Sequence, residues 1–406
     1  MKQSVSLMIL LLSFICVASA TADTRLMLVT DLHYLAPELY DTSGYFERIL
    51  LQGDGKVAHE SETLLNALKA EVAHQAPDAL LISGDLTFNG ETASHVRLAG
   101  ALREIEEAGT PVYVIPGNHD LNILFARGYF PDGITVEKTL PFEAYPEIYQ
   151  KFLPSADDRS SARMGGTARV GDVTLLFLDG CVYEPHAETY GVVPEATLNW
   201  LRETLEAHRG ETVVTISHHS LIPHSSYMQP MFVLQNTRQV MNLLQAAGVR
   251  LHLSGHLHLQ HIAEEDGITD AATAAFCIYP HTYAMITVGH GQIQYNACGL
   301  CPEHLPEGFT ERSADFFMNT TAGKLKSWTD TLPITEEQKQ QMLDYAMKLN
   351  LQYFSGTIER SLPYWTESEA ASLWQQYADG SQFADYMNEI LQEKALPARS
   401  VVLSLP

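Results

Sequence analysis

The sequence predicts an α/β protein with a helical region at its C-terminal end. Short apolar, β-branched runs alternate with segments in which apolar residues recur at helical spacing, a pattern typical of a mainly parallel sheet covered by helices. Several of the apolar runs end abruptly in glycine followed by Asp, Asn or His. After about Pro306 only helical patterns remain. We therefore expect an α/β domain over residues 21–305 and a helical domain over residues 306–406.

The first twenty residues have the composition of a secretory signal peptide. Lys2 precedes an apolar run from about Val5 to Val17, and Ala18-Ser19-Ala20 is a small-residue cleavage site. A buried N-terminal helix is the alternative interpretation. The sequence thus predicts a signal peptide at residues 1–20 and export to the periplasm or the extracellular space. No later apolar run is long enough to span a bilayer.

The net charge of the chain restricts the classes of molecule that it can bind. Acidic residues number 49 against 25 basic ones, which gives a net charge of -24. A nucleic-acid polymer is therefore not expected as a partner, because binding to its phosphates needs basic clusters. A small anionic substrate would need local positive charge, most simply metal ions. The oligomeric state is left open.

Four cysteines remain after the predicted signal peptide. In an oxidising compartment they permit two disulfides, and buried free thiols are the alternative. Cys298 and Cys301 have the spacing of a redox or zinc pair, but a zinc ribbon needs a second such pair and the chain has none. The full set is Cys181, Cys277, Cys298 and Cys301.

Strands and helices alternate through the α/β region. Strands are expected at residues 25–30, 79–83, 112–115, 172–178, 211–216 and 250–253, and helices at 60–74, 92–108, 194–208 and 235–247. Residues 121–169 are rich in Pro, Gly, Tyr and Phe, and we interpret them as a long excursion over the edge of the sheet. Segments 272–278, 283–288 and 292–296 have the pattern of closing antiparallel strands.

The C-terminal region has its own helix signals. Thr335-Glu336-Glu337-Gln338 is a capping box, and Thr366-Glu367-Ser368-Glu369 is interpreted as a second one. Apolar stripes at helical spacing follow both, and a third helix is expected around residues 383–391. We interpret the aromatic residues of these stripes as core rather than binding surface, which predicts an all-helical appendage.

Five strand ends carry residues that can bind a metal ion. Each alone has an ordinary explanation, such as a surface turn or a helix cap. Their recurrence indicates a single site, because the carboxyl ends of parallel strands meet at one edge of a sheet. The residues are Asp31 with His33, Asp85, Asn118 with His119, His218, and His256 with His258.

These residue types suit two metal ions. A binuclear site needs one bridging carboxylate, and the isolated Asp85 is the natural bridge. Mixed nitrogen and oxygen donors without thiolate fit Mn, Fe or Zn. Asp31, His33 and His258 would complete one site, and Asn118, His218 and His256 the other. Glycines at 84, 117 and 255 are expected where the backbone turns sharply beneath the cluster.

The order Asp-x-His, Gly-Asp, Gly-Asn-His-Asp, His, Gly-His-x-His resembles the calcineurin-like metallophosphoesterase superfamily over about residues 25–260. Within it the chain looks most like bacterial class III cyclic nucleotide phosphodiesterases. Residues 31–37 (Asp-Leu-His-Tyr-Leu-Ala-Pro), 54–56 (Asp-Gly-Lys), 83–87 (Ser-Gly-Asp-Leu-Thr) and 89–91 (Asn-Gly-Glu) carry that likeness, as does the helical C-terminal region. The resemblance implies a two-sheet β-sandwich flanked by helices, in four layers, with a binuclear metal centre at the sheet edges.

The resemblance also implies an activity. Proteins of this kind hydrolyse cyclic nucleotides or related small phosphodiesters, and the nucleophile is a hydroxide that bridges the two metal ions. By the same resemblance, His119 does not bind a metal ion and instead protonates the leaving group or stabilises its charge. A phosphomonoesterase or nucleotidase with the same centre is the alternative, and a non-catalytic metal-binding scaffold is a third interpretation.

Several nearby residues are further candidates. Asp120 is expected to orient His119 by accepting its other ring proton, and capping of the following segment is the alternative. His219 is a candidate for contacting the substrate or a ligand, or for replacing His218 as ligand. Arg127, together with Tyr129, is a candidate for binding substrate phosphate or base, with a salt bridge or a core position as the alternative. His252 and His261 are marginal ligand candidates because they lie close to the cluster in sequence.

Overall fold

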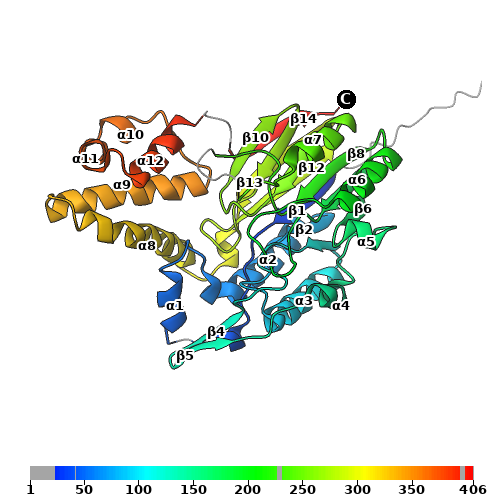
Figure 1. Ribbon diagram of the computed structural model, residues 1–406, viewed down its shortest axis with the longest axis horizontal. Helices are drawn as coiled ribbons and strands as arrows, with labels where there is room; N and C mark the ends of the chain where they lie inside the picture. The colour runs from blue at the N-terminus through cyan, green and yellow to red at the C-terminus, as the bar shows by residue number, and fades with distance from the viewer. Residues whose placement is uncertain (1–22, 42, 226–230, 394–397, 406) are drawn as a thin grey trace, which may run out of the picture.

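Two six-stranded sheets form the centre of the molecule. In the computed structural model, which describes residues 23–41, 43–225, 231–393 and 398–405, their strand orders are β14-β13-β12-β1-β2-β3 and β10-β11-β9-β8-β7-β6 (Figure 1). The predicted signal peptide lies outside the described residues. Among these residues, no helix combines the length and the apolarity that crossing a bilayer requires.

The first sheet has a parallel half and an antiparallel half. Its parallel strands are β1 (Thr24–Val29), β2 (Ala79–Ser83) and β3 (Val112–Ile115). β12 (Thr282–Gly289), β13 (Gln292–Gly299) and β14 (Ser400–Ser404) continue it as antiparallel neighbours.

The second sheet is parallel in its interior. Its parallel strands are β7 (Val173–Leu178), β8 (Thr212–Ser217), β9 (Leu251–Ser254) and β11 (Ile268–Ala272). β6 (Gly166–Val170) and β10 (His261–Glu265) form its antiparallel edges.

Helices cover the outer faces of both sheets, which confirms the predicted sandwich. Alternation along β1 shows the layering, because Leu26 and Leu28 point into the core between the sheets while Met27 and Val29 join the core beneath the helices. α2 (Ser61–Gln75) and α3 (Thr92–Glu107) cover the first sheet, and α6 (Glu195–Ala207) and α7 (Thr237–Ala246) cover the second.

Short elements fill the connections. They are η1 (Pro37–Leu39), α1 (Tyr45–Leu50), η2 (Ala58–Glu60), β4 (Arg127–Phe130), β5 (Gly133–Val136), η3 (Phe142–Ala144), α4 (Tyr145–Tyr149), α5 (Arg159–Ala162) and η4 (Pro302–His304). The excursion predicted for residues 121–169 therefore contains a β4–β5 hairpin, and it ends at β6, a strand that the sequence did not indicate.

The C-terminal helices lie to one side of the sheets (Figure 1). They are α8 (Phe309–Thr329), α9 (Glu336–Phe354), α10 (Tyr364–Glu367), α11 (Glu369–Ala378) and α12 (Gln382–Gln392). The capping box at Thr335 is confirmed. The second proposed box is wrong, because Ser368 rather than Thr366 caps α11 by accepting a hydrogen bond from the Ala371 N–H.

Two predictions near the end of the chain are wrong, one of a strand and one of an all-helical region. Residues 273–278 are not a strand, because their apolar side chains, Ala275, Cys277 and Ile278, are buried against Phe317 of α8 instead of in a sheet. The region after residue 306 is not all helical, because β14 returns to pair with β13. The four cysteines at 181, 277, 298 and 301 are free thiols.

Candidate metal centre

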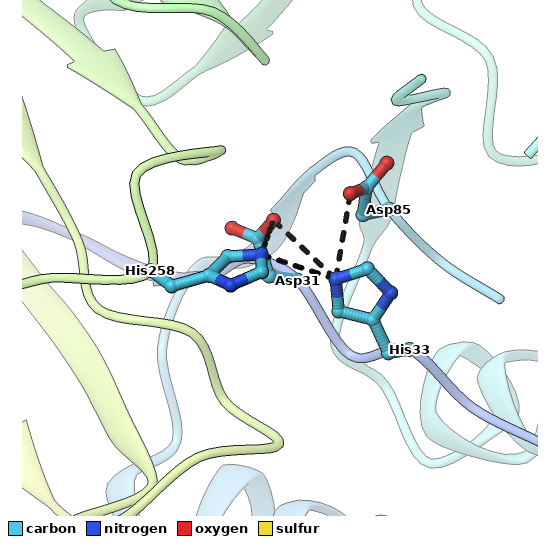
Figure 2. A group of neighbouring side chains, drawn as sticks. All are labelled: Asp31, His33, Asp85 and His258. Carbon is cyan, nitrogen blue, oxygen red and sulfur yellow. Dashed lines mark hydrogen bonds and ion pairs between the residues drawn. The ribbon is translucent and has the colours of Figure 1, made fainter. Parts of the chain in front are cut away.

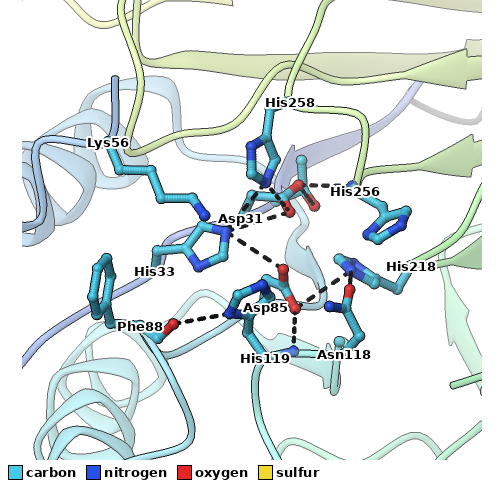
Figure 3. A network of polar contacts seen from close by, with 12 residues as sticks. Asp31, His33, Lys56, Asp85, Phe88, Asn118, His119, His218, His256 and His258 are labelled. Atoms are coloured by element: carbon cyan, nitrogen blue, oxygen red, sulfur yellow. Dashed lines mark hydrogen bonds and ion pairs between the residues drawn. The ribbon is translucent and has the colours of Figure 1, made fainter. Parts of the chain in front are cut away.

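The predicted ligands converge where strands of both sheets end (Figure 3). Each ligand or ligand pair directly follows the carboxyl end of its strand or lies within four residues of it. Asp31 and His33 follow β1, Asp85 follows β2, Asn118 follows β3, His218 follows β8, and His256 and His258 follow β9.

One group brings Asp31, His33, Asp85 and His258 together (Figure 2). His33 Nε2 lies 3.2 Å from His258 Nε2 and 3.4 Å from Asp85 Oδ2. His258 Nε2 lies 3.4 Å from Asp31 Oδ1. Two imidazole nitrogens and two carboxylate oxygens therefore face a common point.

A second group contains Asp85, His218 and His256, whose ligand atoms lie within 4.8 Å of one another. His218 Nε2 is 3.4 Å from Asp85 Oδ1 and 3.0 Å from the side-chain oxygen of Asn118. Asp85 thus turns Oδ2 to the first group and Oδ1 to the second, which is the arrangement of a bridging carboxylate.

Unpaired atoms in both groups fit metal ions. Asp31 Oδ1, Asp85 Oδ2 and His256 Nε2 are buried without a hydrogen-bond partner among the described residues. Leaving such atoms unpaired costs roughly 1–3 kcal/mol each, so native structures rarely do so without an ion or water. His218 Nδ1 donates to the Ser83 carbonyl at 2.9 Å, which leaves the lone pair of Nε2 free to bind a metal ion.

Burial keeps two of the imidazoles neutral. It lowers the pKa of His33 well below its usual value, with a further contribution from Lys56, and it lowers the pKa of His256 similarly, with further contributions from His219 and His218. Metal binding requires this neutral form.

His258 differs from these two histidines. Burial and Lys56 lower its pKa, but contacts with Asp31 and Asp54 outweigh them and raise it to about 9. Burial raises the pKa of Asp31, but its ion pair with His258 brings it down to about 2. In this ion pair His258 carries a proton between its ring and Asp31, and a metal ion bound by the same two residues would replace that proton.

The ligands are held by an uncommon backbone conformation. Non-glycine residues with positive φ are rare, and when they cluster they mark functional sites. Five of the seven predicted ligands are of this kind: Asp31 (φ 52°), His33 (39°), Asp85 (48°), His256 (66°) and His258 (60°).

The three predicted glycines serve two purposes. Gly84 has φ +99°, and a Cβ there would lie 2.5 Å from His218 Nδ1, so both conformation and space require glycine. Gly117 and Gly255 do not have positive φ. Cβ atoms there would collide with the main-chain nitrogen of Asp85 and with Thr30 Oγ1. At these two positions close packing, rather than the predicted sharp turn, requires glycine.

His119 lies beside both groups without belonging to either. Its main-chain N–H donates to Asp85 Oδ1 at 2.8 Å. Its ring Nδ1 lies 3.1 Å from the Phe88 carbonyl (Figure 3). The same nitrogen lies 3.1 Å from Asn89 Oδ1. Because a carbonyl only accepts, the proton is assigned to Nδ1, and Nε2 is left to react.

The predicted role of Asp120 is wrong. Its carboxylate accepts hydrogen bonds from the main-chain N–H groups of Gly117, Leu86 and Thr87, at 2.7, 3.0 and 2.9 Å, and from the Thr87 hydroxyl. The side chain therefore ties together the loops after β2 and β3, and Phe88 and Asn89 orient His119 instead.

Three other candidates lie outside the ligand groups. His219 Nε2 donates to the Thr189 carbonyl at 2.9 Å, so His218 rather than His219 takes the ligand position. The ring centroids of His219 and His256 lie 4.3 Å apart, so His219 contacts a predicted ligand. The side chain of Arg127 is exposed on β4. Tyr129 is buried and stacks on Phe46, with ring centroids 4.5 Å apart. It therefore occupies a core position, which was the alternative to binding substrate.

The two marginal histidines do not join the centre. His252 bonds Thr215 Oγ1 at 2.9 Å and Ser217 Oγ at 3.0 Å within the second sheet. His261 Nδ1 lies 3.1 Å from His224 Nδ1. Both are engaged elsewhere.

The structure adds residues whose roles the sequence did not predict. Asp54 lies 3.2 Å from His258 Nδ1, and Lys56 lies 3.3 Å from Asp54. Phe88 and Asn89 orient His119. Residues 54–56 and Asn89 drew attention only through the family likeness, and Phe88 was not noted at all, because nothing in their local pattern indicates which strand end they approach.

Comparisons with known proteins agree with this arrangement. Residues 24–260 match the family described as calcineurin-like phosphoesterase, and residues 308–396 match the C-terminal domain of cyclic nucleotide phosphodiesterase. The chain therefore belongs to the calcineurin-like phosphoesterase family of metal-dependent phosphoesterases.

Several relatives are named as cyclic nucleotide phosphodiesterases. A probable cyclic nucleotide phosphodiesterase of Rhodococcus erythropolis is 24% identical over 232 residues, which cover 56% of this chain and 68% of the relative. A cAMP/cGMP dual specificity phosphodiesterase of Mycobacterium tuberculosis is 26% identical over 202 residues, 50% of this chain and 55% of the relative. The chain thus spans between half and about two thirds of the length of these relatives.

A solved structure shows the same fold. The dimetal phosphatase of Danio rerio superposes with a TM-score of 0.51 at 15% sequence identity, over 68% of this chain and 96% of that one. The superposition therefore covers about two thirds of this chain and nearly all of the phosphatase.

Proposed function

We propose that this chain is a binuclear metal-dependent phosphodiesterase that hydrolyses cyclic nucleotides or related small phosphodiesters. The observation that carries the proposal is Asp85, which presents a separate oxygen to each of two ligand groups. The names of the relatives and the match of residues 308–396 support the substrate class. The net charge of -24 argues against a polymeric nucleic acid.

The ligand groups specify where metal ions would bind. Nitrogen and oxygen donors suit Mn, Fe or Zn. Two such ions would supply a water-derived nucleophile at neutral pH and would neutralise charge on the phosphoryl oxygens. Asp85 would bridge the two sites; Asp31, His33 and His258 would complete one, and Asn118, His218 and His256 the other.

His119 would assist the departure of the leaving group. Its main chain is fixed by Asp85 and its ring by the Phe88 carbonyl, so Nε2 is held in place beside the centre. Burial lowers the pKa of His119, which makes its protonated ring a stronger acid. It would deliver that proton to the departing alkoxide oxygen.

Apolar side chains near His119 support a substrate with a flat, uncharged part. Phe125 is 47% exposed, with its ring centroid 6.5 Å from that of His119, and the neighbouring Leu124 is 73% exposed. Large exposed apolar side chains beside a polar centre are typical of ligand-binding sites. A nucleobase could pack against this rim while its phosphate lies at the centre.

Paired substrates test the type of reaction. Metal-loaded protein is expected to hydrolyse bis-p-nitrophenyl phosphate and cyclic nucleotides faster than p-nitrophenyl phosphate. The screen includes 2′,3′- and 3′,5′-cyclic nucleotides, glycerophosphodiesters and nucleotide monophosphates. A strong preference for the monoesters would overturn the proposal in favour of a phosphomonoesterase. No turnover in either wild type or His119→Asn would indicate a non-catalytic scaffold.

We also infer that the chain is exported to the periplasm or beyond and that residues 1–20 are removed. The charged start, the apolar run and Ala18-Ser19-Ala20 support this inference. N-terminal sequencing of protein recovered from periplasmic and culture fractions is expected to begin near Thr21. An intact N-terminus on protein confined to the cytosol would contradict it.

A further inference from the structure

A third group of metal-binding side chains lies outside the candidate centre, where α2 meets η4. Glu71 and His74 are three residues apart on α2, a spacing that places side chains on one face of a helix. His304 comes from η4, in the connection between β13 and α8. One donor atom from each of these three residues lies within 4.8 Å of the other two.

The donor set is one that zinc uses. His304 Nδ1 lies 2.8 Å from Glu71 Oε2, and the ring centroids of His74 and His304 are 5.6 Å apart. Two imidazoles and one carboxylate bind Zn²⁺ in proteins with ligand bonds of about 2.0–2.2 Å. Tetrahedral donors at that range are about 3.3–3.5 Å apart. On metal binding the distance between Glu71 Oε2 and His304 Nδ1 would therefore increase slightly, and the exposed His74 ring would move toward these two atoms.

Glu71 is fixed before any metal binds. It is 1% exposed, and it accepts hydrogen bonds from the Tyr283 hydroxyl at 2.8 Å, the Gln75 amide at 2.9 Å and the Cys301 main-chain N–H at 3.0 Å. Burial raises the pKa of its carboxyl, but these bonds outweigh burial and lower it. A charged, oriented carboxylate is thus available, while the exposed His74 and the half-buried His304 leave a path for an ion.

We propose that Glu71, His74 and His304 bind a third divalent ion of the zinc type, with water completing the coordination. The ion would clamp α2, which covers the first sheet, to the segment that leads from β13 into the C-terminal helices. This site lies outside the phosphodiesterase centre, and its role is structural.

The neighbouring thiols are not part of the site. Cys301 Sγ lies 3.6 Å from Glu303 Oε2, and Cys298 Sγ lies 3.7 Å from the Asn296 carbonyl. The Cys-x-x-Cys spacing is therefore not what binds the ion. Cys301→Ser is a suitable control because it removes the thiol of the residue whose main-chain N–H binds Glu71, without removing a proposed ligand.

Counting bound zinc tests the proposal. The full chain is loaded with Zn²⁺, passed over a desalting column and analysed for metal. Wild type is expected to bind three equivalents per chain and His74→Ala two. Because His74 is exposed, its substitution is not expected to disturb folding. His290→Ala removes another exposed histidine, outside the three groups, and together with Cys301→Ser should retain three equivalents.

The readout is the difference in zinc content between wild type and His74→Ala. Incomplete loading of the main centre lowers the zinc content of both proteins equally and does not affect this difference. Equal zinc content in these two proteins would overturn the proposal, and so would the same loss in His290→Ala. Zinc is also expected to raise the melting temperature of wild type more than that of His74→Ala, and an equal rise would contradict a clamp. None of these readouts depends on turnover, so they stand whether or not the proposed activity is found.

Discussion

Consecutive residues of the Gly117–Asp120 turn have different surroundings and therefore different roles. Asn118 points its side-chain oxygen at His218 in the second ligand group. His119 is held beside that group by Asp85 and Phe88. Asp120 turns away to accept hydrogen bonds from the loop after β2. The sequence indicates a cluster here, but the partner of each side chain depends on which loop packs against the turn.

Replacing His119 tests its role as the acid. His119→Asn is expected to lower kcat for a cyclic nucleotide by about 10²–10⁴-fold, the usual contribution of a positioned acid. The loss should be much smaller for bis-p-nitrophenyl phosphate, because nitrophenolate leaves without a proton. Steady-state kinetics on both substrates, with metal content measured alongside, checks this. An equal loss on both substrates, or a loss of metal, would contradict it.

Replacing Asp120 tests the corrected assignment. Asp120→Asn offers one accepting oxygen in place of two, so main-chain N–H groups at Gly117, Leu86 or Thr87 lose their partner. The free energy of unfolding is expected to fall by about 1–3 kcal/mol. Urea unfolding of the variant, with kcat of the folded protein, is the measurement. Unchanged stability with the same kinetic loss as His119→Asn would restore the orienting role.

At the scale of elements, the predicted strands and helices that bear the centre are close to those observed. β2 and β3 have the predicted bounds, and β1, β8 and β9 shift by one residue. These strands are predictable because they are apolar runs that end in turn residues. The structures of β14 and of segment 273–278 are not predictable in this way, because tertiary contacts with β13 and α8 decide whether an apolar run joins a sheet.

The start of α3 contains a buried carboxyl that makes stability depend on pH. Glu91 is fully buried at the N-cap and accepts from the Asn89 N–H at 3.0 Å, and burial raises its pKa to about 7. In the unfolded chain its pKa is near the ordinary value of 4.5. Between these values the folded protein keeps a proton that the unfolded chain releases. Stability from this group is complete below about pH 4.5 and is lost as pH rises toward 7.

Glu91→Gln is expected to remove that dependence. Wild type should lose up to about 3 kcal/mol from this group between pH 4.5 and 7. The variant keeps an accepting oxygen and carries no charge, so its profile should be flatter by that amount. Urea unfolding at pH 5 and pH 7.5 measures the difference. Profiles that superimpose would contradict the raised pKa.

At the scale of the whole molecule, the C-terminal helices support the metal centre. Leu257 and Leu259, on either side of His258, are buried in the same core as α9, α11 and α12. The Gln260 N–H donates to the Phe354 carbonyl of α9 at 2.9 Å. A Cβ on Gly55 would lie 2.5 Å from the Phe317 ring of α8, so that helix packs directly against residues 54–56.

Truncating Phe317 should therefore affect the centre from a distance. Phe317→Ala is expected to destabilise the protein by about 3–5 kcal/mol. It should also weaken metal binding, because the Asp54 contact with His258 depends on the loop beneath Phe317. Metal titration of the folded protein measures the second effect. Leu205→Ala, buried where α6 packs on the second sheet and outside the core of the C-terminal helices, is the control and should lower stability without changing metal affinity. Equal metal affinity in Phe317→Ala would contradict the support role.

The site residues as a set are tested most directly by anomalous diffraction from crystals of Mn- or Zn-loaded protein. The account predicts two strong peaks about 3.5–4 Å apart. Asp85 should lie between them, with Asp31, His33 and His258 around one peak and Asn118, His218 and His256 around the other. A single peak at the strand ends, or a pair of peaks that Asp85 does not bridge, would contradict the binuclear centre and the phosphodiesterase mechanism built on it.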